Sequence, residues 1–136
     1  MGIMQEPAGN RTLALIVDYT WSDRDAYVTY FAQHGINTVD AEDGLHGIAK
    51  AASLLPDVIA VDLRTPGPDA VDMCFRLKRQ ESTKHIPIIA VTENGTTGEI
   101  DRAMRAGCAS VLVKPCLPQT LLDEIRRVLS LPALPA

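Results

Sequence analysis

Apolar residues gather in five short runs along the chain, and longer segments with a helical spacing of apolar positions lie between them. Most of the runs are continuous and rich in Val, Ile and Ala, which is typical of strands covered on both faces of a sheet. We predict strands at residues 12–17, 36–41, 58–61, 86–91 and 110–113. Their alternation with helices predicts βαβ units with right-handed crossovers, and therefore an α/β fold around a parallel sheet.

Capping and turn residues predict where the helices begin and end. Ser22 is placed as the N-cap of a first helix that stops at Gly35, and Asp69 as the cap of the third. Gly107 is expected at the C-terminal end of the fourth helix, and Pro118 at the first position of the fifth.

The inward faces of the first two helices follow from the same spacing. In the first helix we expect Ala26 and Tyr30 to face the core, together with Val28 and Phe31. In the second helix, the spacing predicts an apolar stripe of Leu45, Ile48, Ala49, Ala52 and Leu55.

Length and composition fit one domain. The chain has 136 residues, of which 46% are hydrophobic and 22% charged, an ordinary balance for a globular protein. We assign residues 12–130 to this domain, residues 1–11 to a flexible lead-in, and residues 131–136 to a tail or the start of a linker.

Charge, cysteine content and hydropathy indicate which partners and which compartment to expect. The formal net charge of −4 argues against direct nucleic-acid binding, which normally needs a basic face. Cys74, Cys108 and Cys116 form no paired motif and favour a reduced, cytoplasmic protein. No apolar run approaches the roughly 20 residues of a membrane span, so we expect no membrane association.

Four of the predicted strands end in a polar residue: Asp18, Asp62, Thr92 and Lys114. Ligands of open parallel sheets bind outside the carboxyl ends of the strands, so these side chains are expected to line one crevice. Two close carboxylates repel each other and favour a bound metal or another cation. The same set also suits a phosphoryl group, since Lys and Thr bind its oxygens and a carboxylate with Mg²⁺ offsets the charge.

An ordered set of segments resembles the receiver domain of two-component response regulators. The resemblance covers roughly residues 12–129 and rests on Leu15-Ile16-Val17-Asp18, Val61-Asp62-Leu63, Thr65-Pro66-Gly67, Ala90-Val91-Thr92 and Val111-Leu112-Val113-Lys114-Pro115. It implies a doubly wound, flavodoxin-like (βα)5 fold whose five parallel strands have the order 2-1-3-4-5.

The resemblance also implies a role for each strand-end residue. Asp62 would accept a phosphoryl group from a histidine kinase, a phosphotransfer protein or a small phosphodonor. Asp18, Asp62 and the backbone carbonyl of Arg64 would bind Mg²⁺, Thr92 would hydrogen-bond the phosphoryl group, and Lys114 would pair with it or with Asp62. The Lys114–Pro115 peptide would be cis.

Five residues depart from the family pattern: Arg64 adds a cation at the edge of the site, Cys116 stands where an aromatic residue is often found, and three others replace usual residues. Tyr19 stands where a second acidic metal ligand is usual, Glu93 where a small residue is usual, and Val111 where an aromatic switch residue is usual. A phenol is a poor Mg²⁺ ligand, so we expect weak Mg²⁺ binding and slow phosphorylation.

Arg64 suggests a compensation for the lost acid. We hypothesise that its guanidinium pairs with Asp18 or Asp62 and neutralises part of the charge that Mg²⁺ would otherwise neutralise.

Three functions compete at this stage. The first is a phosphoacceptor receiver that switches a protein-interaction face and has no enzymatic activity beyond slow self-phosphorylation and self-dephosphorylation. Its expected partners are a sensor histidine kinase or phosphotransfer protein and a downstream protein or fused output domain, and a homodimer is a further expectation. The second is a degenerate receiver that binds or dimerises without phosphorylation. The third, a flavodoxin-like enzyme or nucleotide binder, has no support beyond the fold.

Overall fold

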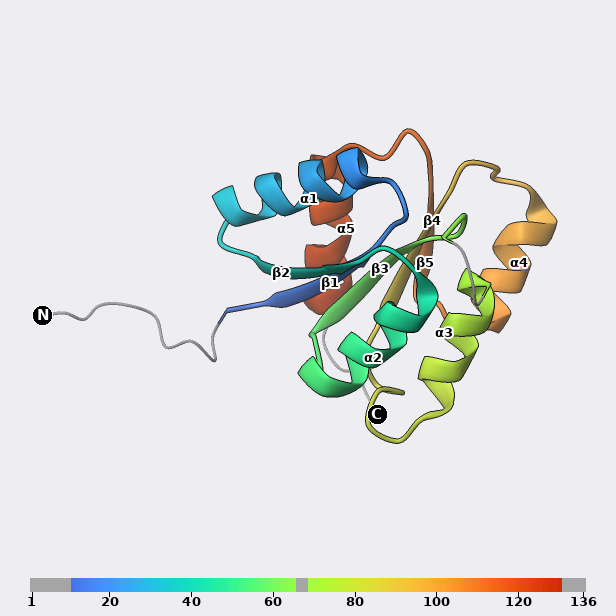
Figure 1. Cartoon of the computed structure of the whole chain (residues 1–136). Helices are drawn as coiled ribbons and strands as arrows, with labels where there is room; N and C mark the ends of the chain where they lie inside the picture. The colour runs from blue at the N-terminus through green and yellow to red at the C-terminus, as the bar shows by residue number, and fades with distance from the viewer. Residues whose placement is uncertain (1–10, 66–68, 131–136) are drawn as a thin grey trace, which may run out of the picture.

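The computed structural model describes residues 11–65 and 69–130 (Figure 1). The predicted tail and nearly all of the predicted lead-in lie outside these residues. Strands and helices alternate in the order β1 (Leu13–Val17), α1 (Trp21–Gln33), β2 (Asn37–Ala41), α2 (Gly44–Leu54), β3 (Val58–Asp62), α3 (Ala70–Arg79), β4 (Ile88–Thr92), α4 (Thr97–Arg105), β5 (Ser110–Val113) and α5 (Pro118–Ser130). No helix in the described part of the chain is both long and apolar enough to cross a membrane.

The five strands form one parallel sheet in the order β2-β1-β3-β4-β5, which confirms the predicted topology. In this register Val17 of β1 lies beside Val61 of β3, and Asp62 lies beside Val91 of β4. The winding reverses between β1 and β3, so the carboxyl ends of these two strands flank the position where such sheets bind ligands.

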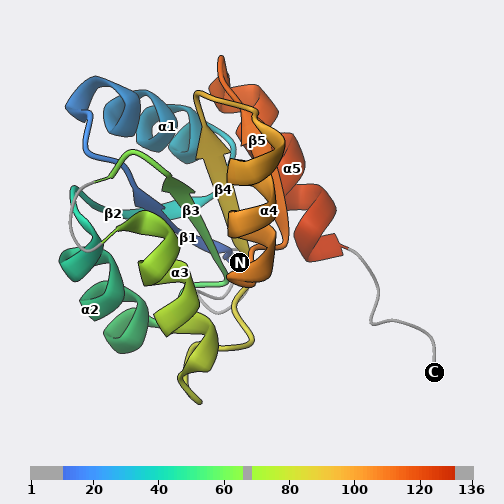
Figure 2. The ribbon, with the colours of Figure 1, turned by 90° about the vertical axis from the view of Figure 1, so that its right-hand side faces the viewer.

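Helices cover both faces of the sheet (Figures 1 and 2). One face packs against α1 and α5, whose buried residues include Phe31 and Leu121. The other packs against α2, α3 and α4 through residues such as Met73, Leu77 and Ala103. Every residue of β3 and β4 is buried, which explains why these strands read as unbroken apolar runs.

The first helix differs from its prediction in both its start and its inward face. It begins at Trp21, and Thr20 occupies the N-cap position without a side-chain hydrogen bond, so the assignment of Ser22 as N-cap was wrong. Phe31 is buried and Tyr30 is half-buried against the core, as expected, but Tyr27 is the second buried residue and Ala26 is exposed. Tyr27 faces inward because its large ring packs beside that of Phe31, with 6.3 Å between the ring centroids, in the core under α1 and α5.

Most of the apolar stripe predicted for α2 lies on the wrong face, and only Ile48 of its five residues packs against the core. Leu45 and Leu55 are exposed, and the residues turned toward the sheet are Gly44, Gly47 and Ala51. A Cβ atom at Gly47 would lie 3.1 Å from both the Met73 sulfur and a Val17 methyl group. Only a small residue fits this close approach. The buried face of α2 therefore carries small residues, and the spacing of the large apolar residues identifies the exposed face instead.

Other local predictions are confirmed. Gly35 and Gly107 follow helix ends with φ values of +80° and +109°, in the left-handed region that favours glycine. The Asp69 side chain caps α3 by accepting a hydrogen bond of 2.8 Å from the Val71 amide. Pro118 is the first residue of α5.

Candidate functional site

Two buried carboxylates mark the carboxyl edge of the sheet. Asp18 follows β1 directly and Asp62 is the last residue of β3, and they are only 3% and 2% exposed. Burial of a carboxylate is unfavourable unless it is hydrogen-bonded or paired with a cation, so the partners of each indicate what the site can bind.

Each carboxylate oxygen of Asp62 has a hydrogen-bond partner. Lys114 Nζ donates to Asp62 Oδ2 at 2.6 Å, and the Arg64 amide donates to Asp62 Oδ1 at 2.8 Å. Burial lowers the pKa of Lys114, but the hydrogen bond and the negative charge of Asp62 outweigh it, so the pKa is raised and the ammonium stays charged. The Lys114–Pro115 peptide bond is cis, as the resemblance implied.

Asp18 is less well compensated than Asp62. Its Oδ1 accepts one hydrogen bond, from the Thr20 amide at 2.9 Å. Burial raises the pKa of Asp18 to about 6, the amide hydrogen bond opposes the rise, and the charges of Asp62 and Asp23 add to it. The ionised form of Asp18 is therefore unfavourable in this environment and would be stabilised by a further cation.

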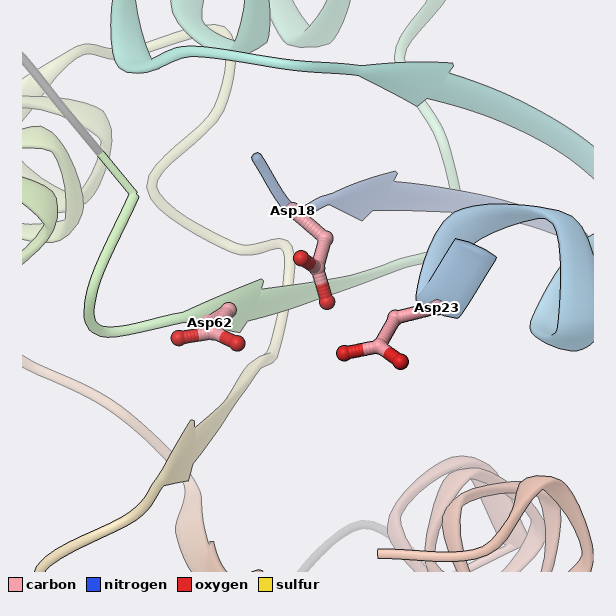
Figure 3. A group of neighbouring side chains, drawn as sticks. All are labelled: Asp18, Asp23 and Asp62. Carbon is pink, nitrogen blue, oxygen red and sulfur yellow. The ribbon is translucent and has the colours of Figure 1, made fainter. Parts of the chain in front are cut away.

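A third carboxylate, Asp23, completes the cluster (Figure 3). One carboxylate oxygen from each of Asp18, Asp23 and Asp62 lies within 4.8 Å of the others, and Asp23 Oδ2 also lies 3.6 Å from Lys114 Nζ. The sequence prediction missed Asp23 because an acid in the first turn of a helix is ordinarily explained by the helix dipole. The feature of the sequence that could have identified Asp23 is its position in the first helical turn after Asp18.

Thr92 lies at the same edge, but its hydroxyl group is turned toward α4. The hydroxyl hydrogen-bonds the carboxylate of Glu99 and the backbone of Asn94, and Thr92 is 1% exposed. The structure thus brings Asp18, Asp62 and Lys114 together as predicted, with Thr92 beside them and bonded elsewhere.

Comparison with known proteins identifies the family. The model of the response regulator receiver domain matches residues 14–126. The chain belongs to this family. It is 31% identical over 116 residues to Protein PilH of Pseudomonas aeruginosa, covering 85% of this chain and 96% of PilH. It spans about half, 48% and 50%, of the length of transcriptional regulators that it also matches.

Solved receiver structures share the fold of this receiver. The chemotaxis response regulator CheY4 of Vibrio cholerae superposes with a TM-score of 0.83 at 28% identity, over 88% of this chain and 99% of CheY4. The receiver domain of sensor histidine kinase PA1611 from Pseudomonas aeruginosa superposes with a TM-score of 0.82 at 23% identity, over 89% of this chain and 99% of that domain. That structure has a magnesium ion coordinated in its active site cleft.

The Arg64 side chain lies between Tyr19 and Glu93, two residues that depart from the receiver pattern, and contacts both. The Arg64 guanidinium pairs with the Glu93 carboxylate and lies 5.4 Å from the centroid of the Tyr19 ring. The hypothesis that this side chain pairs with Asp18 or Asp62 was therefore wrong for the described structure. Glu93 on the neighbouring loop is an exposed partner that costs less desolvation, and the Arg64 amide alone reaches Asp62.

Proposed function

We propose that this receiver accepts a phosphoryl group on the Asp62 carboxylate from the phosphohistidine of a sensor kinase or phosphotransfer protein. The observation that carries the proposal is the buried Asp62 carboxylate, held between Lys114 and the Arg64 amide at the carboxyl edge of the sheet. In the transfer, an Asp62 oxygen forms the new bond to phosphorus while the bond to the histidine nitrogen breaks. The imidazole leaves with the electron pair of that bond.

Lys114 has two roles in this proposal. Before transfer its ammonium holds Asp62 in one orientation through the 2.6 Å hydrogen bond. During transfer the same ammonium is placed to bind a phosphoryl oxygen and to offset the growing negative charge. The receiver is assigned no enzymatic activity beyond slow self-phosphorylation and hydrolysis of its own acyl phosphate.

The residues present fit a magnesium ion. Asp18, Asp23 and Asp62 offer the oxygen ligands that Mg²⁺ prefers, and the raised pKa of Asp18 shows that this cluster lacks positive charge. We assign these three side chains and the Arg64 carbonyl to the ion, with Asp23 supplying the acid that is missing at Tyr19. When bound, Mg²⁺ neutralises charge on the transferring phosphoryl group.

Asp23→Asn is expected to weaken Mg²⁺ binding by about tenfold or more, because it removes one of three anionic ligands. Titration calorimetry with MgCl₂ measures the affinity. Asp25→Asn is the matched control, since Asp25 is an exposed acid on the same helix outside the carboxylate cluster. Equal affinity of Asp23→Asn and wild type would remove Asp23 from the site.

The proposed function is tested by looking for a covalent phosphoryl adduct. The protein is incubated with acetyl phosphate and Mg²⁺, and its intact mass is measured. We expect one added phosphoryl group in wild type and none in Asp62→Asn, which keeps the shape of the side chain but is a poor nucleophile. The absence of an adduct with acetyl phosphate and with phosphorylated donor proteins would overturn the proposal and leave an interaction module that works without phosphorylation.

The relatives support a proposal for the partner on the output side. Several relatives of roughly twice the matched length are named as transcriptional regulators, whereas PilH is nearly the same length as the match. We propose that phosphorylation changes how this receiver binds a downstream protein or a joined output domain.

A further inference from the structure

The Thr92 hydroxyl group makes a bond that the proposed transfer does not use. Thr92 Oγ1 accepts a hydrogen bond from the Asn94 amide at 3.1 Å and contacts the Glu99 carboxylate. Glu99 lies in the first turn of α4, where its own amide donates to the capping hydroxyl of Thr96 at 3.3 Å. One buried hydroxyl thus joins the end of β4 to the start of α4.

A threonine hydroxyl has a single proton to donate. In the described structure its acceptors are the Glu99 carboxylate and the Asn94 carbonyl at 3.1 Å, and Glu99 is the anionic one. A phosphoryl group on Asp62 would place a second anion at the same edge, because β3 and β4 are adjacent and Asp62 lies beside Val91. Two anions would then compete for one donor, and only one of them can have it.

We propose that Glu99 is a positioning residue that holds the Thr92 hydroxyl toward α4 and releases it when Asp62 carries a phosphoryl group. The proposal rests on the phosphoacceptor function of Asp62. Loss of this bond removes the contact that joins Thr92 to the first turn of α4 and leaves Thr96 to hold that turn, so Glu99 couples the site to that helix. Val111 is apolar and packs against the core under α2, α3 and α4. It has no polar group that could hydrogen-bond the Thr92 hydroxyl when that hydroxyl changes its position.

Thermodynamic reciprocity makes the proposal quantitative. If phosphoryl binding breaks the Thr92–Glu99 bond, that bond opposes phosphoryl binding by the same free energy. Removing Glu99 must then strengthen the binding of a phosphoryl mimic, and the strengthening must depend on the Thr92 hydroxyl.

The experiment measures the affinity of beryllium trifluoride in the presence of Mg²⁺ by titration calorimetry. We expect Glu99→Ala to bind about tenfold more tightly than wild type, the size of one net hydrogen bond, and Glu99→Gln to lie between them. Asp101→Ala, which removes an exposed acid from the same helix, should match wild type. In a Thr92→Ala background, Glu99→Ala should cause no further change.

A second readout follows α4 itself. Hydrogen exchange of the Glu99 and Ile100 amides, which donate to Thr96, should speed up when wild type binds the mimic. In Glu99→Ala it should be fast from the start and unchanged by the mimic. Wild-type affinity in both Glu99 variants, or an equal gain with and without the Thr92 hydroxyl, would overturn the role of Glu99. If wild type forms no Asp62 adduct and binds no mimic, the phosphoacceptor function itself has failed.

Discussion

Lys114→Met is expected to lower the free energy of unfolding by about 2–3 kcal/mol at neutral pH in the absence of Mg²⁺. Removing one partner of a buried ion pair leaves an uncompensated charge and costs about 3–5 kcal/mol when both partners are fully buried. The Asp62 side chain is 1% exposed but that of Lys114 is 20% exposed, so the expected loss is below that range. Asp18 and Asp23 add to the effect, because all three carboxylates lose their shared cation.

Urea unfolding monitored by circular dichroism, with a chelator present, measures this loss. Lys84→Met is the control, since Lys84 forms an exposed pair with Glu81 and its replacement should change stability by less than about 1 kcal/mol. A double variant that adds Asp62→Asn should recover much of the stability, because the uncompensated charge is gone. A Lys114→Met protein as stable as the Lys84→Met control would contradict the importance of the pair.

Asp18→Asn is expected to stabilise the protein by about 2–3 kcal/mol at pH 7 when no divalent ion is present. Burial raises the pKa of Asp18 from 3.8 to about 6, and each unit corresponds to about 1.4 kcal/mol. The folded state therefore holds this proton more tightly than the unfolded state. The protonated Asp18 carboxyl group therefore makes its full favourable contribution to the free energy of unfolding below pH 4, and this contribution is lost as the pH rises through 6. The amide of Asn keeps the shape without the charge.

The measurement is the free energy of unfolding of both proteins between pH 3.5 and 7.5 in a chelator. The gain from Asp18→Asn should be absent near pH 3.5 and reach its full size above pH 6.5. Asp25→Asn, at an exposed position of α1, should stay within about 0.5 kcal/mol of wild type across the range. A gain that is independent of pH would mean that the buried charge of Asp18 is not its source.

Much of the fold was predictable because its signals are local. Continuous runs such as Val58–Val61 indicate strands buried on both faces, and Gly35, Asp69, Gly107 and Pro118 mark helix ends through their own backbone preferences. Side chains at the ends of neighbouring parallel strands share one edge, so the strand order implied by the resemblance also brought Asp18, Asp62 and Lys114 together.

The tertiary structure decided what depends on the packing of separate elements. The inward face of α2 follows from a close approach at Gly47, which the spacing of larger apolar residues conceals. Asp23 joins the carboxylate cluster because the first turn of α1 lies over the end of β1, and Arg64 turns to Glu93 because the neighbouring loop offers an exposed partner. The contact of Thr92 with Glu99 depends on the position of α4. The sequence by itself determined which strands end in polar groups, since strand periodicity is local, while the three-dimensional packing determined which of those groups meet.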